Sequence, residues 1–412
     1  MEDRLLYAKL LGIEFPWLIS RVHVDMPAER IDVWVEEASG ARFACAACQQ
    51  DAPVYDHTPE HAWRHLETCQ CRTYVHASLP RTHCPKDGVK QVRSPWAEPR
   101  SQFTRVFERR MIDTLKECDV TGVTRLTGTS WDETWGVMMR AVDRGLARKD
   151  RRVPARIGID EKSVGKGHEY ESLVCDLDGS TVEYVVDDRK KESLESYYRQ
   201  FNAEELRQIE AIAMDMWEPY VRATQDHVPD AAGKIVFDRF HATKYVVTAV
   251  DTVRRAEHKA LAQSGDQRLK GTKYLWLRHE ENIPDWLREE FAAVKSAELK
   301  TSRAWAIKES LRKFWMYSYQ KCAEKYFTAW YFWATHSRIA PMIEAARTLK
   351  RHLANILTYF KHRITNATAE GINSKIQMIK LMACGYRNRN HYRAAIYFHC
   401  GGLDLYPRPA VT

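Results

Sequence analysis

The sequence has no long apolar run. No stretch of its 412 residues approaches the roughly 18–20 consecutive apolar residues that span a bilayer. The opening MEDRLLYAKL starts acidic and has no uninterrupted apolar segment of the kind that a secretory signal carries. The pattern argues against membrane and secreted classes, so we expect a cytoplasmic protein without a membrane partner.

Repeats and low-complexity tracts do not stand out either. Hydrophobic residues make up 44% of the chain and it contains 13 Trp, which indicates a globular protein. A chain of 412 residues exceeds the size at which one core usually stops growing, so roughly two to four domains are expected. The net charge of +8 fits a polyanionic partner, although many basic proteins bind none.

The character of the sequence changes along the chain. Short β-like runs alternate with Cys, His and Pro up to residue 92, and RSPWAEPRS then has the proline content of a linker. Helical periodicity follows, then a mixed α/β pattern, then an almost entirely helical stretch dense in Arg, Lys, Trp and Tyr. The expected parts are 1–92, a Cys-rich module; 93–152, a helix-turn-helix and linker; 153–244, an α/β part; 245–362, an all-helical part; and 363–412, a last helix and tail.

Within the α/β part, apolar runs predict five strands. ARIGIDEKS, YESLVCDLDG and TVEYVVDDR are predicted as three consecutive strands, with a turn at Asp178-Gly179. IEAIAMDMW and KIVFDRFH are predicted as two more, each preceded by a helix. In this βββαβαβ order, the first and fourth strands are expected to lie side by side.

Acidic residues are scarce between 361 and 393, where seven Lys or Arg accompany one acid, Glu370. Asp160 follows an apolar triplet on the first predicted strand, and Asp215 ends the apolar run of the fourth. Each acid alone has an ordinary explanation, because strand-end Asp residues often solvate loops and an acid in a first helical turn favours the macrodipole. Their matching positions instead favour one shared cation site, with Asp238 on the fifth strand as the main rival to Asp215.

Carboxylates that are brought together raise each other's pKa unless a divalent metal neutralises them. Mg²⁺ prefers hard oxygen ligands, and two such ions about 3.5–4 Å apart stabilise both the attacking and the leaving oxygen of a phosphoryl displacement. Glu370 would then be a metal ligand, and cations near it, including Lys375 and Arg387, would hold a DNA backbone. The expected cofactor is two Mg²⁺ ions, with Mn²⁺ as a substitute.

Residues 102–149 have the outline of a helix-turn-helix. A turn is expected at Gly128-Thr129-Ser130, and Ser130 with Glu133 fits the capping box of the following helix. That helix would enter the major groove with its early residues, although its Trp residues are more often core anchors. The candidate DNA contacts are Thr129, Ser130 and Thr134 at the helix start and Arg148, Lys149, Arg151 and Arg152 beyond its end. A solvated charged linker would have the same basic composition.

Six ordered motifs resemble those of the ISL3-type insertion-sequence transposases, which are bacterial DDE enzymes. They are IGIDEKSVGKGHEY, MDMWEPY, FDRFHATKY, DTVRRAEHK, TNATAEGINSKIQMIKLMACGYRN and the terminal CGGL. The resemblance covers nearly the whole chain. It implies a multidomain α/β protein with a ribonuclease-H-like catalytic domain, interrupted by a large all-helical insertion and preceded by a zinc-finger-like module and a helix-turn-helix.

The resemblance also implies roles for individual residues. The catalytic acids that bind the metal would be Asp160, Asp215 and Glu370. Asp238 and His241, in DRFH, match an Asp-x-x-His motif near the active site and become supporting residues. A hydrogen-bonded core histidine is an equal alternative for His241.

Ten cysteines are scattered along the chain, and five of them lie between residues 45 and 84. In a reducing cytosol this clustering favours a metal site over disulfides. Relatives carry two Cys-x-x-Cys or Cys-x-x-His pairs; here CAAC supplies Cys45 and Cys48, but Cys84 is followed by Asp87. Zn²⁺ accepts an Asp oxygen at about 2.0–2.2 Å, so these four residues remain the candidate zinc ligands. The nearby softer alternatives to Asp87 are Cys69, Cys71 and His83.

The implied activity is DNA transposition. The enzyme would bind terminal inverted repeats, use water to expose a 3′-OH, and join that end to target DNA. Its partners would be double-stranded DNA and at least one further copy of the chain, because two element ends must be held, and its location would be the bacterial cytoplasm and nucleoid. Two alternatives stay open: a DNA-binding regulator with an inert catalytic fold, and a structure-specific nuclease without strand transfer.

Overall fold

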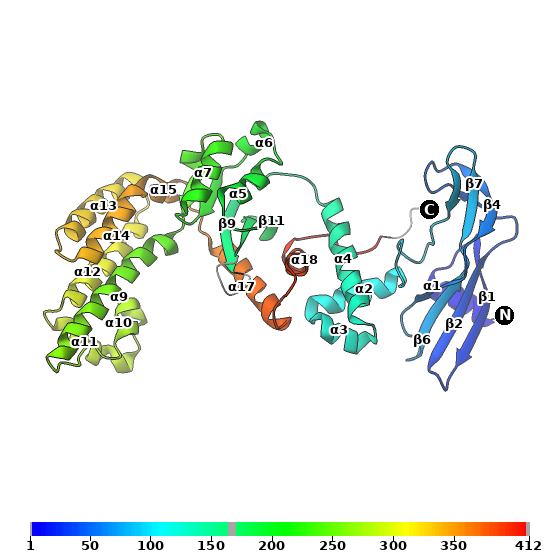
Figure 1. Ribbon diagram of the computed structural model, residues 1–412, viewed down its shortest axis with the longest axis horizontal. Helices are drawn as coiled ribbons and strands as arrows, with labels where there is room; N and C mark the ends of the chain where they lie inside the picture. Colours follow the sequence, from blue (N-terminus) through cyan, green and yellow to red (C-terminus); the bar gives the residue numbers. More distant parts are fainter. Residues whose placement is uncertain (1, 164–169, 409–412) are drawn as a thin grey trace. The chain divides into compact units, whose positions relative to one another are not determined.

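The computed structural model describes residues 2–163 and 170–408 and divides into two compact units (Figure 1). Residues 164–169 of the first transposase-like motif lie outside the described residues. In the described part of the chain, no helix combines the length and apolarity that a membrane crossing needs. The first unit comprises residues 1–149, 379–399 and 403–412, and the second comprises 150–378 and 400–402.

The N-terminal module of the first unit contains two four-stranded sheets, with the orders β1-β2-β6-β5 and β3-β4-β7-β8. Strands β2 and β6 are parallel, and alternating apolar residues bury a core that includes Trp17, Val33 and Trp63. The short strands expected here are confirmed. The elements are α1 (Glu2–Leu11), β1 (Trp17–Asp25), β2 (Arg30–Glu37), β3 (Arg42–Ala44), β4 (Asp51–His57), β5 (His61–Arg64), β6 (Arg72–Ala77), β7 (Pro80–Cys84) and β8 (Gly88–Gln91).

Residues 93–101 are packed against this module. Trp96 is 6% exposed, and its ring centroid lies 5.1 Å from that of Trp17 and 5.5 Å from that of Trp63. The linker expected from the prolines is therefore not observed, because burying a large aromatic side chain stabilises the packed arrangement.

The predicted helix-turn-helix region contains three helices, α2 (Arg105–Glu117), α3 (Val120–Thr127) and α4 (Trp131–Arg148). Gly128 ends α3 with a φ of 64°, a left-handed conformation that glycine adopts without strain. The capping box is present: the Ser130 hydroxyl accepts from the Glu133 N–H at 3.2 Å, and the Glu133 carboxylate accepts from the Ser130 N–H at 2.7 Å. The turn and the helix start are therefore confirmed.

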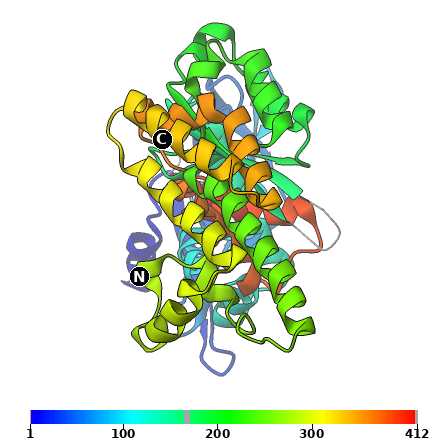
Figure 2. The same cartoon turned by 90° about the vertical axis from the view of Figure 1, so that its left-hand side faces the viewer.

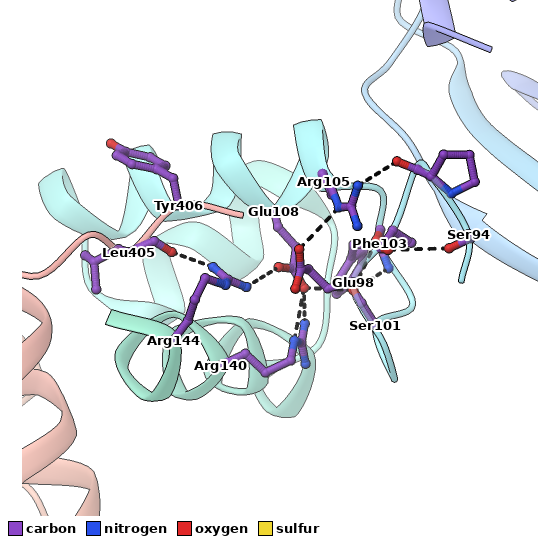
Figure 3. A network of polar contacts seen from close by, with 12 residues as sticks. Ser94, Glu98, Ser101, Phe103, Arg105, Glu108, Arg140, Arg144, Leu405 and Tyr406 are labelled. Atoms are coloured by element: carbon purple, nitrogen blue, oxygen red, sulfur yellow. Dashed lines mark hydrogen bonds and ion pairs between the residues drawn. The ribbon is translucent and has the colours of Figure 1, made fainter. Parts of the chain in front are cut away.

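Glu108 is fully buried in this helical domain, and its carboxylate is held by several donors (Figure 3). Oε1 accepts from the Ser101 hydroxyl at 2.7 Å and from Arg140 Nε at 3.0 Å, and Oε2 accepts from Arg144 at 3.2 Å. Arg144 also donates to the carbonyl of Leu405. One carboxylate thus joins α2, α4 and the C-terminal tail of this unit.

The second unit contains a five-stranded sheet of order β11-β10-β9-β12-β13. The first three strands pair antiparallel, and β12 lies parallel to both β9 and β13. The βββαβαβ order and the neighbouring positions of the first and fourth strands are confirmed. The elements are β9 (Arg156–Ser163), β10 (Tyr170–Asp176), β11 (Thr181–Asp187), α5 (Lys191–Tyr198), α6 (Ala203–Arg207), β12 (Ala211–Met214), α7 (Glu218–His227), α8 (Ala231–Lys234) and β13 (Ile235–Phe237).

A helical region follows the last strand, as expected for 245–362. The long helix α9 packs along α12 and α14, and α13 packs on α14 (Figures 1 and 2). Buried aromatic residues such as Phe314, Phe327 and Trp330 fill the space between helices. The elements are α9 (Arg239–Gln263), α10 (Lys273–Leu277), the 3₁₀ turns Glu280–Asn282 and Asp285–Leu287, α11 (Arg288–Ser296), α12 (Lys300–Leu311), the 3₁₀ turn Arg312–Met316, α13 (Gln320–Thr335), α14 (Ala340–Arg351), α15 (Leu353–Leu357) and α16 (Tyr359–His362).

Helices α17 (Ala367–Met382) and α18 (Arg389–Cys400) complete the chain. The start of α17 approaches β9 closely at Gly158, where an added Cβ would lie 3.2 Å from the Cβ of Ala369. Ile372 and Ile376 are buried, whereas Glu370 is exposed. The expected last helix is therefore present and amphipathic, with its acid directed away from the apolar face.

Candidate catalytic site and metal centre

Three aspartates lie at the same level of the sheet in the second unit. Strand β12 pairs in constant parallel register with β9 on one side and with β13 on the other. Continuing these registers by one or two residues puts Asp215 beside Asp160 in one direction and beside Asp238 in the other. Equivalent positions of neighbouring strands direct their side chains to the same face, so the topology brings these carboxyl groups toward one another.

Asp160 is partly buried within β9. Its Oδ1 accepts from the Glu161 N–H at 2.8 Å, and its Oδ2 accepts from the Asn373 amide at 2.6 Å. Burial raises the pKa of Asp160 to about 6; the neighbouring charge of Asp215 adds to this, while the Glu161 N–H and His241 oppose it. The ionised form is therefore incompletely stabilised by the protein alone.

Asn373, on α17, leaves an unsatisfied oxygen beside this carboxylate. Its Oδ1 is buried and has no hydrogen-bond partner among the described residues, while its Nδ2 donates to Asp160. A buried carbonyl oxygen without a donor is unfavourable, and a hydrated or directly bound cation would satisfy it. The site thus fits a cation with oxygen ligands.

Asp215 follows β12 directly and accepts from the Trp217 N–H at 3.1 Å. Burial raises its pKa, while the charges of His241, Lys244 and Arg189 and the Trp217 hydrogen bond oppose the increase. Like Asp160, it forms no ion pair with Lys or Arg within residues 2–163 and 170–408.

Asp238 and His241 form a local pair at the start of α9. Asp238 caps this helix, accepting from the N–H groups of Phe240 at 3.0 Å and His241 at 3.3 Å, and His241 Nδ1 lies 3.3 Å from the same carboxylate oxygen. Burial acts to raise the pKa of Asp238, but these hydrogen bonds hold it below its usual range. The bond to Asp238 raises the pKa of His241, assisted by the charges of Asp215 and Asp160. Asp238 therefore has a structural role as the N-cap of α9, which Asp160 and Asp215 do not have.

Glu370 lies on the exposed face of α17, one helical turn before Asn373. The contact between Asn373 and Asp160 attaches this helix to the sheet. In the described part of the chain, one group of three or more His, Cys, Asp or Glu residues has its ligand atoms within 4.8 Å of one another, and it is in the N-terminal module. The carboxylates of Asp160, Asp215 and Glu370 are therefore not all within that distance. A cation shared by all three acids stays a prediction.

That group consists of Cys45, Cys48, Cys84 and Asp87, as the cysteine pattern predicts. The Sγ atoms of Cys48 and Cys84 lie 3.4 Å apart, and Asp87 Oδ2 lies 3.7 Å from Cys45 Sγ and 3.6 Å from Cys84 Sγ. Ligands at about 2.3 Å from a tetrahedral Zn²⁺ stand about 3.8 Å apart, so the spacing fits zinc. The Asp87 carboxylate also raises the pKa of Cys48 to about 12, a conflict of negative charges that a cation would remove.

The alternative zinc ligands are not part of this group. Cys69 and Gln70 have φ values of 50° and 68° and form a tight turn between Thr68 and Cys71. Cys71 is 3% exposed and packs in the core of the module, whereas Cys69 and His83 are exposed. Cys71 is therefore a small buried hydrophobic side chain of this core.

At the start of α4 the candidate DNA contacts differ in accessibility. Thr134 is fully buried, and its hydroxyl bonds to the Ser130 carbonyl at 3.0 Å and to the Thr129 hydroxyl at 2.8 Å. Thr129 and Ser130 also take part in the turn and cap. These bonds assign Thr134 a role in shaping the turn, and because its side chain is fully buried it is not accessible for the predicted base contact. Base contacts by Thr129 and Ser130 stay predictions.

The basic residues at the end of α4 and after it form hydrogen bonds or ion pairs within their own units. Arg148 donates to the Tyr406 carbonyl at 2.7 Å, Arg151 lies 3.2 Å from Glu205, and Arg152 pairs with the buried Asp176 at 2.6 Å. Phosphate binding by these residues and by Lys149 stays a prediction, as it does for Lys375 and Arg387, which are exposed.

Sequence reasoning assigned no role to the two asparagines of α17 and the segment before it. Asn373 contacts Asp160, and Asn366 is 1% exposed, donates its N–H to Asp238 at 3.4 Å, and has an amide group without a partner among the described residues. The available signal was the spacing of Asn373 from Glu370, since residues three apart on a helix share a face.

Three family models match consecutive parts of this chain. Residues 41–87 match the zinc-finger of transposase IS204/IS1001/IS1096/IS1165, and residues 92–142 match the helix-turn-helix domain of transposase family ISL3. Residues 157–396, more than half of the chain, match the ISL3 transposase domain. The protein is therefore a transposase, a DNA-processing enzyme with a DNA-binding helix-turn-helix.

More narrowly, the chain belongs to the ISL3 family of insertion-sequence transposases, which confirms the resemblance seen in its motifs. It is 24% identical over 417 residues to the transposase for insertion sequence element IS1557 of Mycobacterium tuberculosis, covering 94% of this chain and 93% of that one. It is 26% identical over 402 residues to the transposase for insertion sequence element IS1001 of Bordetella parapertussis, covering 95% and 97%. The similarity thus extends along all domains.

Proposed function

We propose that this chain is a DDE transposase that binds the terminal inverted repeats of an insertion sequence and catalyses Mg²⁺-dependent strand cleavage and strand transfer. Asp160, Asp215 and Glu370 are its metal-binding acids. The observation that carries the proposal is the pair of carboxylates on adjacent parallel strands, both partly buried, both with a raised pKa, and neither ion-paired with Lys or Arg among the described residues. Such a pair is unfavourable unless a cation neutralises it.

The fold supports a ribonuclease-H-like assignment for the catalytic domain. Three antiparallel strands are followed by two parallel ones, with helices between them. The helical region between β13 and α17 then corresponds to the insertion, and α17 supplies the third acid. This arrangement gives each acid a rigid element: Asp160 within β9, Asp215 at the end of β12, and Glu370 on a helix of 16 residues.

The residues of the site have separate roles in binding metal, orienting the carboxylates and reducing the repulsion between them. Two divalent ions, Mg²⁺ or Mn²⁺, would supply activation of the attacking oxygen and stabilisation of the pentacovalent phosphorus. Asp160, Asp215 and Glu370 would hold these ions. Asn373 fixes the orientation of the Asp160 carboxylate. His241, oriented by Asp238, moderates the repulsion between the two aspartates.

The reaction has two phosphoryl transfers. In the first, water attacks the scissile phosphorus, one phosphodiester bond breaks, and the element end leaves with a free 3′-OH. In the second, that 3′-OH attacks a phosphorus of target DNA, so that one phosphodiester bond forms as another breaks. No covalent intermediate with the enzyme is required.

The N-terminal parts recognise the element ends. Cys45, Cys48, Cys84 and Asp87 would hold a zinc ion that links the hairpins of the second sheet, because these residues come from the end of β3, the end of β7 and the turn before β8. The helix-turn-helix places the start of α4 in a major groove. Because two ends must be held for transfer, the working form is a dimer or a higher oligomer, bound to DNA in the cytoplasm.

The test uses labelled element-end DNA, the full chain and Mg²⁺. Wild type is expected to nick the end and join it to a second DNA, whereas Glu370→Gln should abolish cleavage and keep end binding in a gel-shift assay. Glu344→Gln, an exposed acid on α14 of the same unit, serves as the matched control and should cleave normally.

The same assay separates the alternatives. An absence of cleavage by wild type, with retained end binding, would support the inert regulator, and cleavage without joining would support the nuclease. Cleavage by the Glu370→Gln variant would refute the assignment of the third acid.

A further inference from the structure

The start of α4, which the helix-turn-helix would insert into a major groove, carries no basic residue in its first two turns. Its first turn has the acids Asp132 and Glu133 instead, and Asp132 is exposed. The first basic residue of the helix, Arg140, binds the buried Glu108. A DNA duplex has about one negative charge per 1.7 Å of its axis, so other segments must supply the cations that hold it at this helix.

Arg72, on β6 of the N-terminal module, lies beside the turn that precedes α4. A Cβ added at Gly128, the residue that ends α3, would lie 3.4 Å from Arg72 Nη2. Arg64 is also close to this turn, but it is buried and pairs with Glu67 at 3.1 Å. Arg72 is exposed, and its guanidinium has no hydrogen bond or ion pair within residues 2–163 and 170–408. The N-terminal module thus presents a cation that is not neutralised at the turn.

The segment that leads into α18 packs against the same helix-turn-helix, and it belongs to the same unit. The ring centroid of His391 lies 4.3 Å from that of Trp135 and 5.7 Å from that of Trp131, so α18 lies beside the start of α4 (Figure 1). Burial and the charge of Asp119, the N-cap of α3, raise the pKa of Tyr386 to about 12. The segment therefore extends from the start of α3 to the start of α4.

Arg387 lies in this segment and is exposed. Its guanidinium has no hydrogen bond or ion pair in the part of the chain that the structure describes. The backbone around it is held in place: the ring centroid of Tyr386 lies 5.2 Å from that of the buried Tyr392, and the side chain of Asn388 accepts from the Asn390 N–H at 2.8 Å. A guanidinium on a fixed backbone suits a phosphate, because less conformational freedom is lost when it binds.

We propose that Arg72 and Arg387 bind phosphates of the duplex that the start of α4 contacts. The DNA-binding surface is then made by three segments that are far apart in the sequence. The proposal rests on the part of the proposed function that places α4 in a groove, and it names the residues that position the duplex there. Such contacts fix the orientation of the protein on DNA and carry no sequence information.

The test is equilibrium binding of the full chain, without Mg²⁺, to a terminal-repeat duplex and to an unrelated duplex of the same length. Each phosphate contact adds about 0.9 to the slope of log affinity against log salt. Arg72→Ala and Arg387→Ala should each reduce this slope by about 0.9, which corresponds to about eightfold weaker binding at about 0.1 M salt and none at about 1 M. Both duplexes should be affected by the same factor.

Three further proteins serve as controls. Arg72→Lys and Arg387→Lys keep the charge and should keep most of the slope. Arg207→Ala removes an exposed arginine on α6 of the second unit, where it lies 2.6 Å from Glu204, and should bind as wild type.

Ethylation of single phosphates locates the contacts. Each alanine variant should become insensitive to ethylation at one or two phosphates that wild type requires. The two sets should lie within about one helical turn, roughly 10 base pairs, because both arginines neighbour the start of the same helix.

Three results would overturn the proposal. One is an unchanged salt slope in either alanine variant. Another is weaker binding that persists at about 1 M salt and that lysine does not relieve, which would make the side chain structural. The third is two sets of phosphates more than one helical turn apart. If wild type binds the terminal repeat no more tightly than the unrelated duplex, the recognition step of the proposed function fails separately, and the slopes on the unrelated duplex still decide the two arginine contacts.

Discussion

Two buried acidic sites in this protein are built in opposite ways. Glu108 in the first unit has Arg140 and Arg144 on its two oxygens, whereas Asp160 and Asp215 in the second have amide donors and no ion pair with Lys or Arg among the described residues. Burying a carboxylate is unfavourable unless it is paired. Glu108 is thus a completed structural contact, while the two aspartates have no Lys or Arg paired with them among the described residues. Pairing, and not burial, separates Glu108 from the proposed metal-binding acids.

The largest effect is expected from neutralising the unpaired site. Asp160→Asn should reduce cleavage of element ends by roughly 10³-fold or more, because the metal-bound transition state loses several kcal/mol of stabilisation. Its thermal stability should equal or exceed that of wild type, since the substitution removes a poorly compensated charge. Asp178→Asn, at an exposed acid in the turn between β10 and β11, is the control and should change neither property. A marked loss of stability in Asp160→Asn would show that the two acidic sites are not opposites.

Removing the paired acid should give the reverse result. Glu108→Ala leaves two arginines without their carboxylate, which should destabilise the first unit by about 3–5 kcal/mol. Hydrogen exchange of the α2 and α4 amides measures this loss, and Glu117→Gln, at an exposed acid on α2, should stay within about 0.5 kcal/mol of wild type. Unchanged exchange in Glu108→Ala would contradict the structural role.

The stability of the second unit should depend on pH through Asp160. Because burial raises the pKa of Asp160 from 3.8 to about 6, the native state binds a proton between these values that the unfolded state does not. In metal-free protein, the free energy of unfolding should therefore fall by up to about 3 kcal/mol as the pH rises through this window. Thermal unfolding in a chelator measures the slope. Asp160→Asn should flatten it, and a slope of the opposite sign would contradict the assignment.

The first unit should show the opposite pH dependence through His65. Its Nδ1 lies 2.9 Å from the Thr104 hydroxyl, and burial lowers its pKa from 6.5 to about 4. The unfolded state then binds more protons below pH 6.5, so stability is fully present above that pH and falls by up to about 3 kcal/mol as the pH approaches 4. Hydrogen exchange of β5 and α2 reports it. His65→Gln should remove the slope, and the exposed His83→Gln should keep it.

The smallest effect is expected at the zinc site, where Asp87 is the one carboxylate in a group with three cysteines. Asp87→Cys should raise zinc affinity about tenfold or more, because a thiolate is a softer ligand than a carboxylate. Competition with a chromogenic chelator measures the affinity, and Asp87→Asn should weaken it. Equal zinc affinity in all three proteins would show that residue 87 is not a ligand.

Much of the fold was predictable where a signal is local. The apolar runs of β9 to β13 and the Ser130 and Glu133 capping box each depend on neighbours in the chain, and the structure has them at the expected places. The grouping of Cys45, Cys48, Cys84 and Asp87 was predictable from the family resemblance, although Asp87 stands where that resemblance leads one to expect Cys or His.

Other features depend on contacts that spacing does not encode. The turn at Cys69 and Gln70, where both residues adopt left-handed conformations, is one of them. Arg152 was a candidate for DNA, and its pairing with Asp176 required knowing that β10 ends beside it. The role of Asn373 required the approach of α17 to β9.

The sequence by itself determined the kinds of element, the helix cap and the residue types that suit zinc and a divalent cation, because propensity, periodicity and ligand chemistry act over a few neighbouring residues. Only the tertiary structure decided that Asn373 reaches Asp160, that Asp87 and not Cys69, Cys71 or His83 joins the three cysteines, and that Glu108 is neutralised while the aspartates are not. Those outcomes arise from strand pairing and packing between distant segments, and it is this packing that sets the charge left over at each site.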